Sequence, residues 1–175
     1  MTSETIGANA ADSRVLTRVG DFVPRDAWAT AGVRCSIEKA LDVVGTRSAM
    51  VLMREAFSGS RRFDQLVLRT GLSEPVAAKR LKQLVADGLF VQQAYRDSGT
   101  RTRLEYVLTE RGRALFPVMA ALMQWGDELG DGRGAMQLFH ADCGEPVTSV
   151  LRCAAGHEVT LSETCARQDL PDDQG

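Results

Sequence analysis

The sequence predicts a mainly α-helical fold with a small two-stranded wing, an α+β architecture of the winged helix-turn-helix type. Three observations predict it. Two amphipathic helical segments lie between positions 63 and 89, and a turn containing Gly71 separates them. Two β-prone segments, 90–95 and 102–108, follow directly and are joined by a polar loop of turn residues. In this order of elements, the second helix is the one that can enter a groove of DNA.

The chain before this motif is predicted to hold an arm and two helices. Residues 1–12 are small and polar, which is typical of disorder, and residues 16–28 resemble an arm that packs on another surface, a partner subunit being one option. A first helix is expected from position 36 to Gly45, because apolar residues recur on one face. These residues are Ile37, Ala40, Leu41 and Val44. A second helix is expected over 47–57.

The helix-turn-helix is expected to follow a short strand at 61–63. A brief helix over 64–69 ends near Gly71, and Ser73 is placed to cap the next helix through its hydroxyl. Pro75 falls within the first turn, where its missing N–H is tolerated. The second helix should turn one apolar face inward. That face consists of Ala77, Leu81, Leu84 and Val85.

A long final helix is expected from about 110 to 129, with Thr109 as its N-cap. Its apolar stripe is broader than one small domain needs to bury. The stripe consists of Leu115, Val118, Met119, Leu122, Met123 and Trp125. We therefore expect a homodimer that buries this helix between its two subunits.

Charge is distributed unevenly along the 175 residues, although the formal net charge is only -2. Residues 61–113 carry eleven Lys or Arg against six Asp or Glu, whereas residues 127–175 carry three against ten. Binding to phosphate depends on the local field rather than the total charge. The central segment is therefore the candidate DNA-binding surface.

The remaining composition favours a cytoplasmic protein that is not an enzyme. No apolar run reaches the length needed to span a membrane, and the first residues do not resemble a signal peptide. In that compartment the four cysteines are expected to be thiols, metal ligands or redox sensors rather than structural disulfides. No glycine-rich phosphate loop or paired-carboxylate constellation is present, and both histidines lie near the C-terminus.

From about Cys35 to Trp125 the chain resembles the HxlR-type winged-helix regulators of bacteria. The resemblance is carried by CSIEKALDVVG, by RRFDQL, by GLSEPVAAKRLKQLVADGLF and by LEYVLTERGRALFPVMAALMQWG. It implies a homodimer built from the terminal helices that binds a dyad-symmetric operator. Two features depart from the family pattern. Thr46-Arg47-Ser48 stands where the family usually has Gly-Lys-Trp, and the wing lacks the usual paired prolines.

Candidate DNA-binding residues follow from the motif. On the second helix we expect base-edge or groove contacts, and Arg80 is expected either to meet phosphate or to brace the fold. The helix candidates are Ser73, Glu74, Ala78, Lys79, Arg80 and Lys82. The wing candidates are Arg96, Arg101 and Arg103, with Arg101 favoured for a phosphate or minor-groove contact. Arg61 and Arg62 are either phosphate contacts or a solvated strand edge.

Cys35 is a candidate redox sensor. It precedes the first predicted helix and follows Arg34, and both a helix N-terminus and a neighbouring cation favour the reactive thiolate. The resemblance also implies this role, because some members of the family sense oxidants through a cysteine at this place. The alternative is a small, half-buried structural side chain.

The C-terminal segment contains a second candidate site. His140-x2-Cys143 and Cys153-x3-His157 flank a strand-like stretch at 145–152, and together they offer two nitrogens and two sulfurs for tetrahedral zinc. A metal would explain how so short and polar a segment folds. Cys165 could replace one histidine as a ligand. The alternatives to zinc are a hairpin with ordinary thiols and redox pairing among Cys143, Cys153 and Cys165.

The sequence thus predicts an N-terminal arm (1–33), a DNA-binding and dimerisation domain (34–129) and an acidic appendage (130–175) with a Cys/His hairpin and a disordered end. The function we expect is a DNA-binding transcriptional regulator, a repressor in most such proteins, that an effector or thiol modification releases from a palindromic operator. One alternative is a winged-helix protein-interaction module without sequence-specific DNA binding. Another is a zinc or redox sensor that acts through the C-terminal hairpin.

Overall fold

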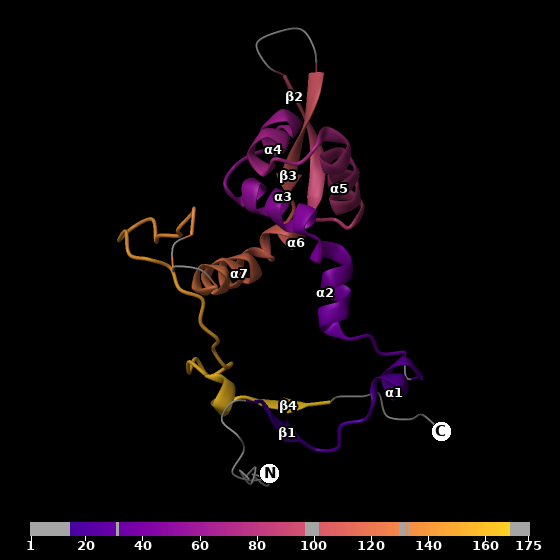
Figure 1. The fold of residues 1–175 in the computed structure, drawn as a ribbon, viewed down its shortest axis with the longest axis vertical. Helices are drawn as coiled ribbons and strands as arrows, with labels where there is room; N and C mark the ends of the chain where they lie inside the picture. Colours follow the sequence, from indigo (N-terminus) through magenta and orange to yellow (C-terminus); the bar gives the residue numbers. More distant parts are fainter. Residues whose placement is uncertain (1–14, 31, 97–101, 130–131, 133, 169–175) are drawn as a thin grey trace. The chain divides into compact units, whose positions relative to one another are not determined.

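A computed structural model of the chain describes residues 15–30, 32–96, 102–129, 132 and 134–168, and it contains two compact units (Figure 1). One unit comprises residues 36–149, and the other combines the segments up to residue 35 and from residue 150 onward. The disorder expected for residues 1–12 and for the end of the chain lies outside the described residues. No helix in the described ranges combines the length and the apolar character that crossing a bilayer requires.

The unit formed by the two ends of the chain is built around a parallel strand pair. Strand β1 (Thr17–Val19) pairs with β4 (Cys165–Arg167), with Thr17 opposite Cys165 and Val19 opposite Arg167. The side chain of Gln168 extends this pairing. Its Oε1 accepts from the backbone N–H of Val23 at 2.7 Å, and its Nε2 donates to the carbonyl of Val23 at 3.3 Å. The arm predicted over 16–28 therefore packs on another segment of its own chain. Helix α1 (Arg25–Thr30) and the 3-10 turn η1 (Leu161–Glu163) complete this unit.

The first two helices of the larger unit lie where the sequence predicts them. Helix α2 spans Ser36–Val44 and α3 spans Arg47–Phe57. The hydroxyl oxygen of Thr46 accepts from the backbone N–H of Ala49 at 3.2 Å, which satisfies one of the free donors at the start of α3. The apolar face of α2 is mostly uncovered within the chain, because only Val44 is buried and Ile37 and Leu41 are 69% and 56% exposed.

The helix-turn-helix consists of α4 (Phe63–Thr70) and α5 (Glu74–Ala86). Gly71 ends α4 in the left-handed conformation (φ 66°), which costs little without a Cβ, and the turn continues through Leu72 to Ser73. One local prediction is wrong, and another is confirmed only in part. The 61–63 segment forms only a single bridge, between Arg62 and Glu105, because the next residue already begins α4. Ser73 occupies the N-cap position of α5, but its side chain makes no capping hydrogen bond.

The core of the larger unit lies between α3, α4, α5 and the strand pair that follows them (Figure 1). The inward face predicted for α5 is confirmed, since Ala77, Leu81 and Leu84 are fully buried and Val85 packs against the same core. Further fully buried members of the cluster come from α3 and α4. They are Ala49, Leu52, Met53 and Leu66. This packing fixes which face of α5 is left for solvent.

The predicted wing is an antiparallel hairpin of β2 (Phe90–Arg96) and β3 (Thr102–Leu108). Phe90 pairs with Leu108 at the base, where Phe90 is 2% exposed and meets the Tyr106 ring edge-to-face at 6.2 Å. The hairpin is therefore anchored in the core at one end. The loop at 97–101 lies outside the described residues.

The single long helix expected from 110 to 129 is wrong. The chain forms α6 (Glu110–Arg113) and then α7 (Phe116–Glu128), with Pro117 in the first turn of α7. Proline has no N–H to donate to the preceding turn, so a continuous helix would lose a hydrogen bond there. The Thr109 cap is confirmed, because its hydroxyl oxygen accepts from Gly112 N–H at 3.0 Å.

The segment after α7 contains two tight hairpins in place of the strand predicted over 145–152. In the first, His140 N–H donates to Glu145 O at 2.9 Å, and an isolated bridge joins Phe139 to Pro146. In the second, Cys153 N–H donates to His157 O at 3.0 Å. Residues 145–152 therefore mostly link the two hairpins. One histidine and one cysteine lie in each hairpin, His140 and Cys143 in the first and Cys153 and His157 in the second.

Candidate nucleic-acid interface

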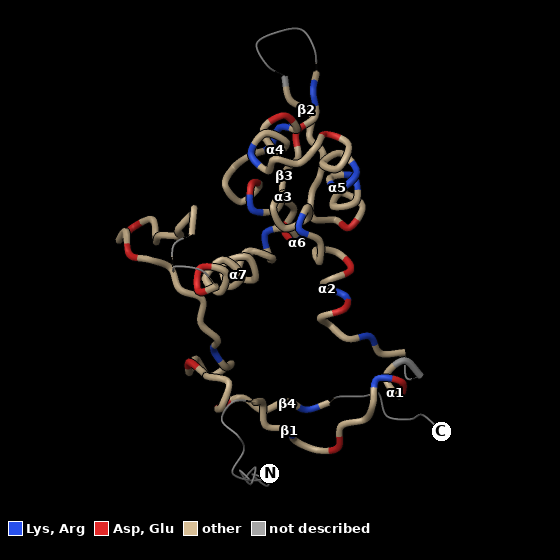
Figure 2. The backbone as a smooth tube through the Cα atoms, viewed as in Figure 1, with Lys and Arg blue, Asp and Glu red and all other residues tan. Residues whose placement is uncertain are grey.

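The outer face of α5 is the candidate recognition surface. Because Ala77, Leu81 and Leu84 are buried, the residues between them on the helix turn outward. The exposed residues there include five predicted candidates, namely Ser73, Glu74, Ala78, Lys79 and Lys82. Figure 2 shows basic residues gathered along α5. Glu74, Ala78 and Lys82 are spaced by four residues, so they lie on adjacent turns of one face.

Arg80 lies at the side of this face and is half-buried. Its Nε donates to the hydroxyl oxygen of Ser48 at 3.3 Å, which links the middle of α5 to the first turn of α3. Of the two roles that the sequence left open for Arg80, bracing the fold is the one this contact supports. Ser48 stands where the HxlR-type regulators that the sequence resembles usually have a tryptophan, and its small hydroxyl group accepts this hydrogen bond.

The two arginines before α4 have different surroundings. The Arg62 guanidinium lies 4.6 Å from the centre of the Tyr95 ring, and Arg62 is half-buried. Arg61 is exposed and lies 3.8 Å from the Glu105 carboxylate. A solvent-screened pair at this distance contributes little stability, so Arg61 can exchange its partner for a phosphate at low cost. Arg62 would first have to leave the aromatic ring.

The wing candidates are only partly described. Arg103 is exposed on β3 opposite Tyr95, and the backbone of Arg96 ends β2 opposite Thr102. The side chain of Arg96 and the whole of Arg101 lie outside the described residues. Arg103 lies near the far end of the hairpin, one residue pair before the last described pair, Arg96 and Thr102.

Sequence reasoning missed one exposed basic residue beside this surface. Arg47 is the first residue of α3, and the Arg80–Ser48 hydrogen bond holds that end of α3 next to α5. Arg47 is therefore a further phosphate-contact candidate. No sequence pattern indicates it, because its proximity depends on a contact between residues 32 positions apart.

Cys35 is half-buried and directly precedes α2, as expected. All four cysteines are free thiols. The redox role of Cys35 stays a prediction, and a Cys35→Ser variant tests it, since it should lose any oxidant-induced release of DNA.

The C-terminal Cys/His residues form two separate pairs. His140 Nδ1 lies 3.2 Å from Cys143 Sγ, and His157 Nδ1 lies 3.7 Å from Cys153 Sγ. Both pairs are exposed, and each hairpin turns at a glycine with positive φ, Gly144 or Gly156. Within the described ranges, no three or more His, Cys, Asp and Glu side chains come together to hold a metal ion. Each pair therefore forms only half of the predicted zinc site.

Comparison with known proteins shows to which family this fold belongs. Residues 43–133 match the family model described as HxlR-like helix-turn-helix. The uncharacterized HTH-type transcriptional regulator Rv3095 of Mycobacterium tuberculosis is 44% identical over 71% of this chain and 80% of its own length. YvaP of Bacillus subtilis, described in the same words, is 32% identical over 52% of this chain and 83% of its own length.

Among solved structures, PA1607 superposes with a TM-score of 0.68 at 32% identity and covers 81% of this chain and 99% of its own. PA1374 from Pseudomonas aeruginosa gives a TM-score of 0.57 at 27% identity, covering 80% of this chain and 96% of its own. The family model covers the helix-turn-helix, the wing and α7, and the relatives are transcriptional regulators rather than enzymes. The chain therefore belongs to the HxlR-like helix-turn-helix family of DNA-binding transcriptional regulators.

Proposed function

We propose that this regulator acts as a homodimeric repressor that binds a palindromic operator. The observation that carries the proposal is an exposed apolar stripe on α7 in the same unit as the α5 surface. Val118, Leu122, Trp125 and Leu129 are 45–68% exposed and recur at intervals of four, three and four residues, so they share one helix face. A contiguous apolar face of this kind marks an interaction surface. A second copy of the chain would cover it.

The exposed residues of α2 support the same proposal. Ile37 and Leu41 are exposed and separated by one helical turn, so α2 adds a second exposed apolar face to the larger unit besides that of α7. A two-fold dimer through α7 and α2 presents two α5 helices, one for each half-site of a symmetric operator. Binding then requires a fixed distance between the two helices. An effector or thiol modification that changes this distance would release the DNA.

Salt dependence tests the proposed DNA contacts against the alternative of a protein-interaction module. Lys and Arg groups that neutralise phosphates release counterions, so affinity falls steeply as salt rises. With roughly six to ten phosphate contacts per dimer, the affinity for operator DNA should fall by about 10³–10⁵-fold between 50 and 200 mM salt. Fluorescence anisotropy measures how affinity depends on salt concentration, once with labelled operator and once with a scrambled duplex. Equal affinity for the two duplexes would favour the alternative.

We also propose that each Cys/His pair supplies two ligands to zinc. The separations of 3.2 and 3.7 Å suit two ligands of one tetrahedral ion, whose Zn–N and Zn–S bonds are about 2.0–2.3 Å. Purified protein should contain zinc, and a Cys143→Ser/Cys153→Ser variant should lose it. Cys165→Ser is the matched control, since Cys165 lies in β4 and its backbone pairs with Thr17. Less than about a third of an equivalent of zinc in the native protein would count against this proposal.

A further inference from the structure

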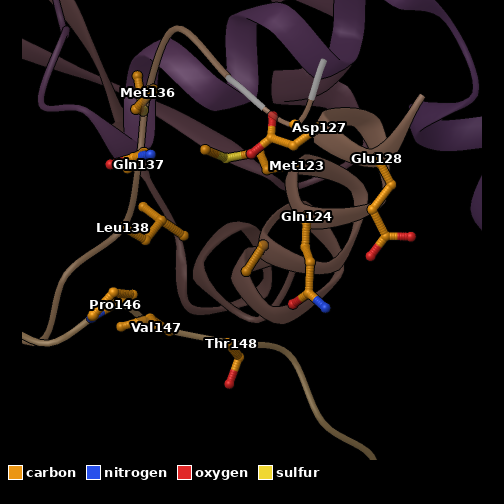
Figure 3. Close-up of a pocket in the computed structure, with 12 residues that line it drawn as sticks. Met123, Gln124, Asp127, Glu128, Met136, Gln137, Leu138, Pro146, Val147 and Thr148 are labelled. Atoms are coloured by element: carbon orange, nitrogen blue, oxygen red, sulfur yellow. The ribbon is translucent and has the colours of Figure 1, made fainter. Parts of the chain in front are cut away.

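A cavity of about 320 Å³ lies between α7 and the segment that follows it, within the larger unit (Figure 3). This volume is at the lower end of the range of roughly 300–1,000 Å³ that small-molecule sites occupy. Its apolar walls consist of Met123, Met136, Leu138, Pro146 and Val147. Methionine side chains fill irregular space and adapt to different ligand shapes.

Hydrogen bonds hold the walls of this cavity in place. The backbone N–H of Val147 donates to Leu138 O at 2.9 Å, which joins the two chain segments of the wall opposite α7. The backbone N–H of Ser149 donates to Gln124 Oε1 at 2.8 Å, so the end of this wall is attached to α7 itself. The cavity is thus bounded by a helix and a segment bonded to that helix.

One end of the cavity is acidic. Asp127 and Glu128 line it from the last turn of α7, where the helix carbonyls add a partial negative charge. Asp127 is half-buried, and a Cβ on Gly134 would lie 2.3 Å from its Oδ1, so the backbone of Gly134 packs directly on the carboxylate. In the part of the chain that is described, no Lys, Arg or His lines the cavity or forms an ion pair with either carboxylate.

From this arrangement we propose that the cavity binds a small amphiphilic cation, an aromatic or alkyl amine. Its ammonium group lies against Asp127 and Glu128, and its apolar part lies between Met123 and Leu138. A neutral molecule of the same shape fills the apolar walls but brings no counter-charge to the carboxylates. An anion is repelled by them. Selectivity for the cation therefore follows from the acidic end and affinity from the apolar walls.

The walls of the cavity also contact the DNA-binding fold. Met123 packs against the hydrophobic core, and Met136 Sδ lies 3.8 Å from the hydroxyl of Ser58 at the end of α3. A ligand that moves these side chains shifts α7 relative to α3. Because the proposed dimer stripe lies on α7, the amine would act as an effector of DNA binding. This regulatory consequence rests on the proposed function, whereas the binding site itself does not.

Titration with phenethylammonium and with 2-phenylethanol tests the site, using isothermal calorimetry on the full chain without DNA. The amine should bind at least tenfold more tightly than the alcohol. The Asp127→Asn/Glu128→Gln variant should lose this preference, while Asp142→Asn/Glu145→Gln, with the same change of charge on exposed residues outside the cavity, should keep it. Equal affinity for amine and alcohol, or a preference that survives in the cavity variant, would overturn the proposal.

A variant that fills the cavity tests the proposal even if Asp127→Asn/Glu128→Gln fails to fold. Val147→Trp places a large side chain in the cavity from a 44% exposed position and should abolish binding of both probes. Far-UV circular dichroism checks that each variant is folded. Amine binding that leaves operator affinity unchanged would overturn the regulatory role alone. A protein that binds the amine but never binds operator DNA would count against the proposed function instead.

Discussion

Replacing Lys79 and Lys82 together by alanine is expected to lower the affinity for operator DNA by at least a hundredfold and to leave dimerisation unchanged. Both side chains are on the exposed face of α5, opposite the buried residues Leu81 and Leu84. Direct contacts of this kind contribute about 1–3 kcal/mol each, and a dimer would lose four of them. Gel-shift titration measures the affinity, and light scattering measures the oligomeric state.

Lys39→Ala is the matched control for this variant. Lys39 is also an exposed helical lysine, but it lies on α2, outside the proposed surface. Its replacement should change operator affinity by no more than about twofold. If the α5 variant bound operator as tightly as the native protein, the assignment of α5 as the recognition helix would be wrong.

Introducing glutamate at Leu122 and Trp125 should convert the protein to a monomer and lower operator affinity by about 10²–10⁴-fold. The two side chains are 45% and 59% exposed within the chain, so the monomer tolerates the change, but a dimer would have to bury two charges from each subunit. The loss of affinity reflects the lost second half-site, whose binding is intramolecular in a dimer. Light scattering and gel-shift titration measure the two effects.

Leu151→Glu/Leu161→Glu is the control for the dimer variant, because these leucines are 69% and 49% exposed and belong to the unit that does not contain α7. This control should remain dimeric. A Leu122→Glu/Trp125→Glu protein that stayed dimeric would exclude the α7 stripe as the interface. A monomer with undiminished operator affinity would exclude the bivalent mode of binding.

The sequence predicts the local structure well wherever one short pattern determines it. The bounds of α3 were predicted residue for residue, because Thr46 caps its start and Ser58-Gly59-Ser60 follows its end. The buried face of α5 was also predicted, since its apolar residues recur at helical spacing. The break before α7 was missed, although Pro117 signals it, because the apolar stripe continues on both sides of the break.

Contacts between distant segments were not predictable in this way. Nothing in the local pattern at 17–19 indicates parallel pairing with 165–167, and nothing near Arg62 indicates that its guanidinium stacks on Tyr95. The apolar face of α2 illustrates a related ambiguity, because periodicity shows that Ile37 and Leu41 share a face but not what covers it. For the same reason the sequence identified the basic residues of the interface but could not assign Arg80 to its contact with Ser48.

The pairing of β1 with β4 has a consequence for the nascent chain. During translation, strand β1 emerges early but has no partner until residues 165–167 have been added, whereas the core from Val44 to Met119 is complete long before. At synthesis rates of about 5–20 residues per second, the ribosome needs roughly 2–10 s to travel from Met119 to Arg167. Throughout that interval the residues of the helix-turn-helix and the wing can fold, while strand β1, which was synthesised first, still lacks its partner.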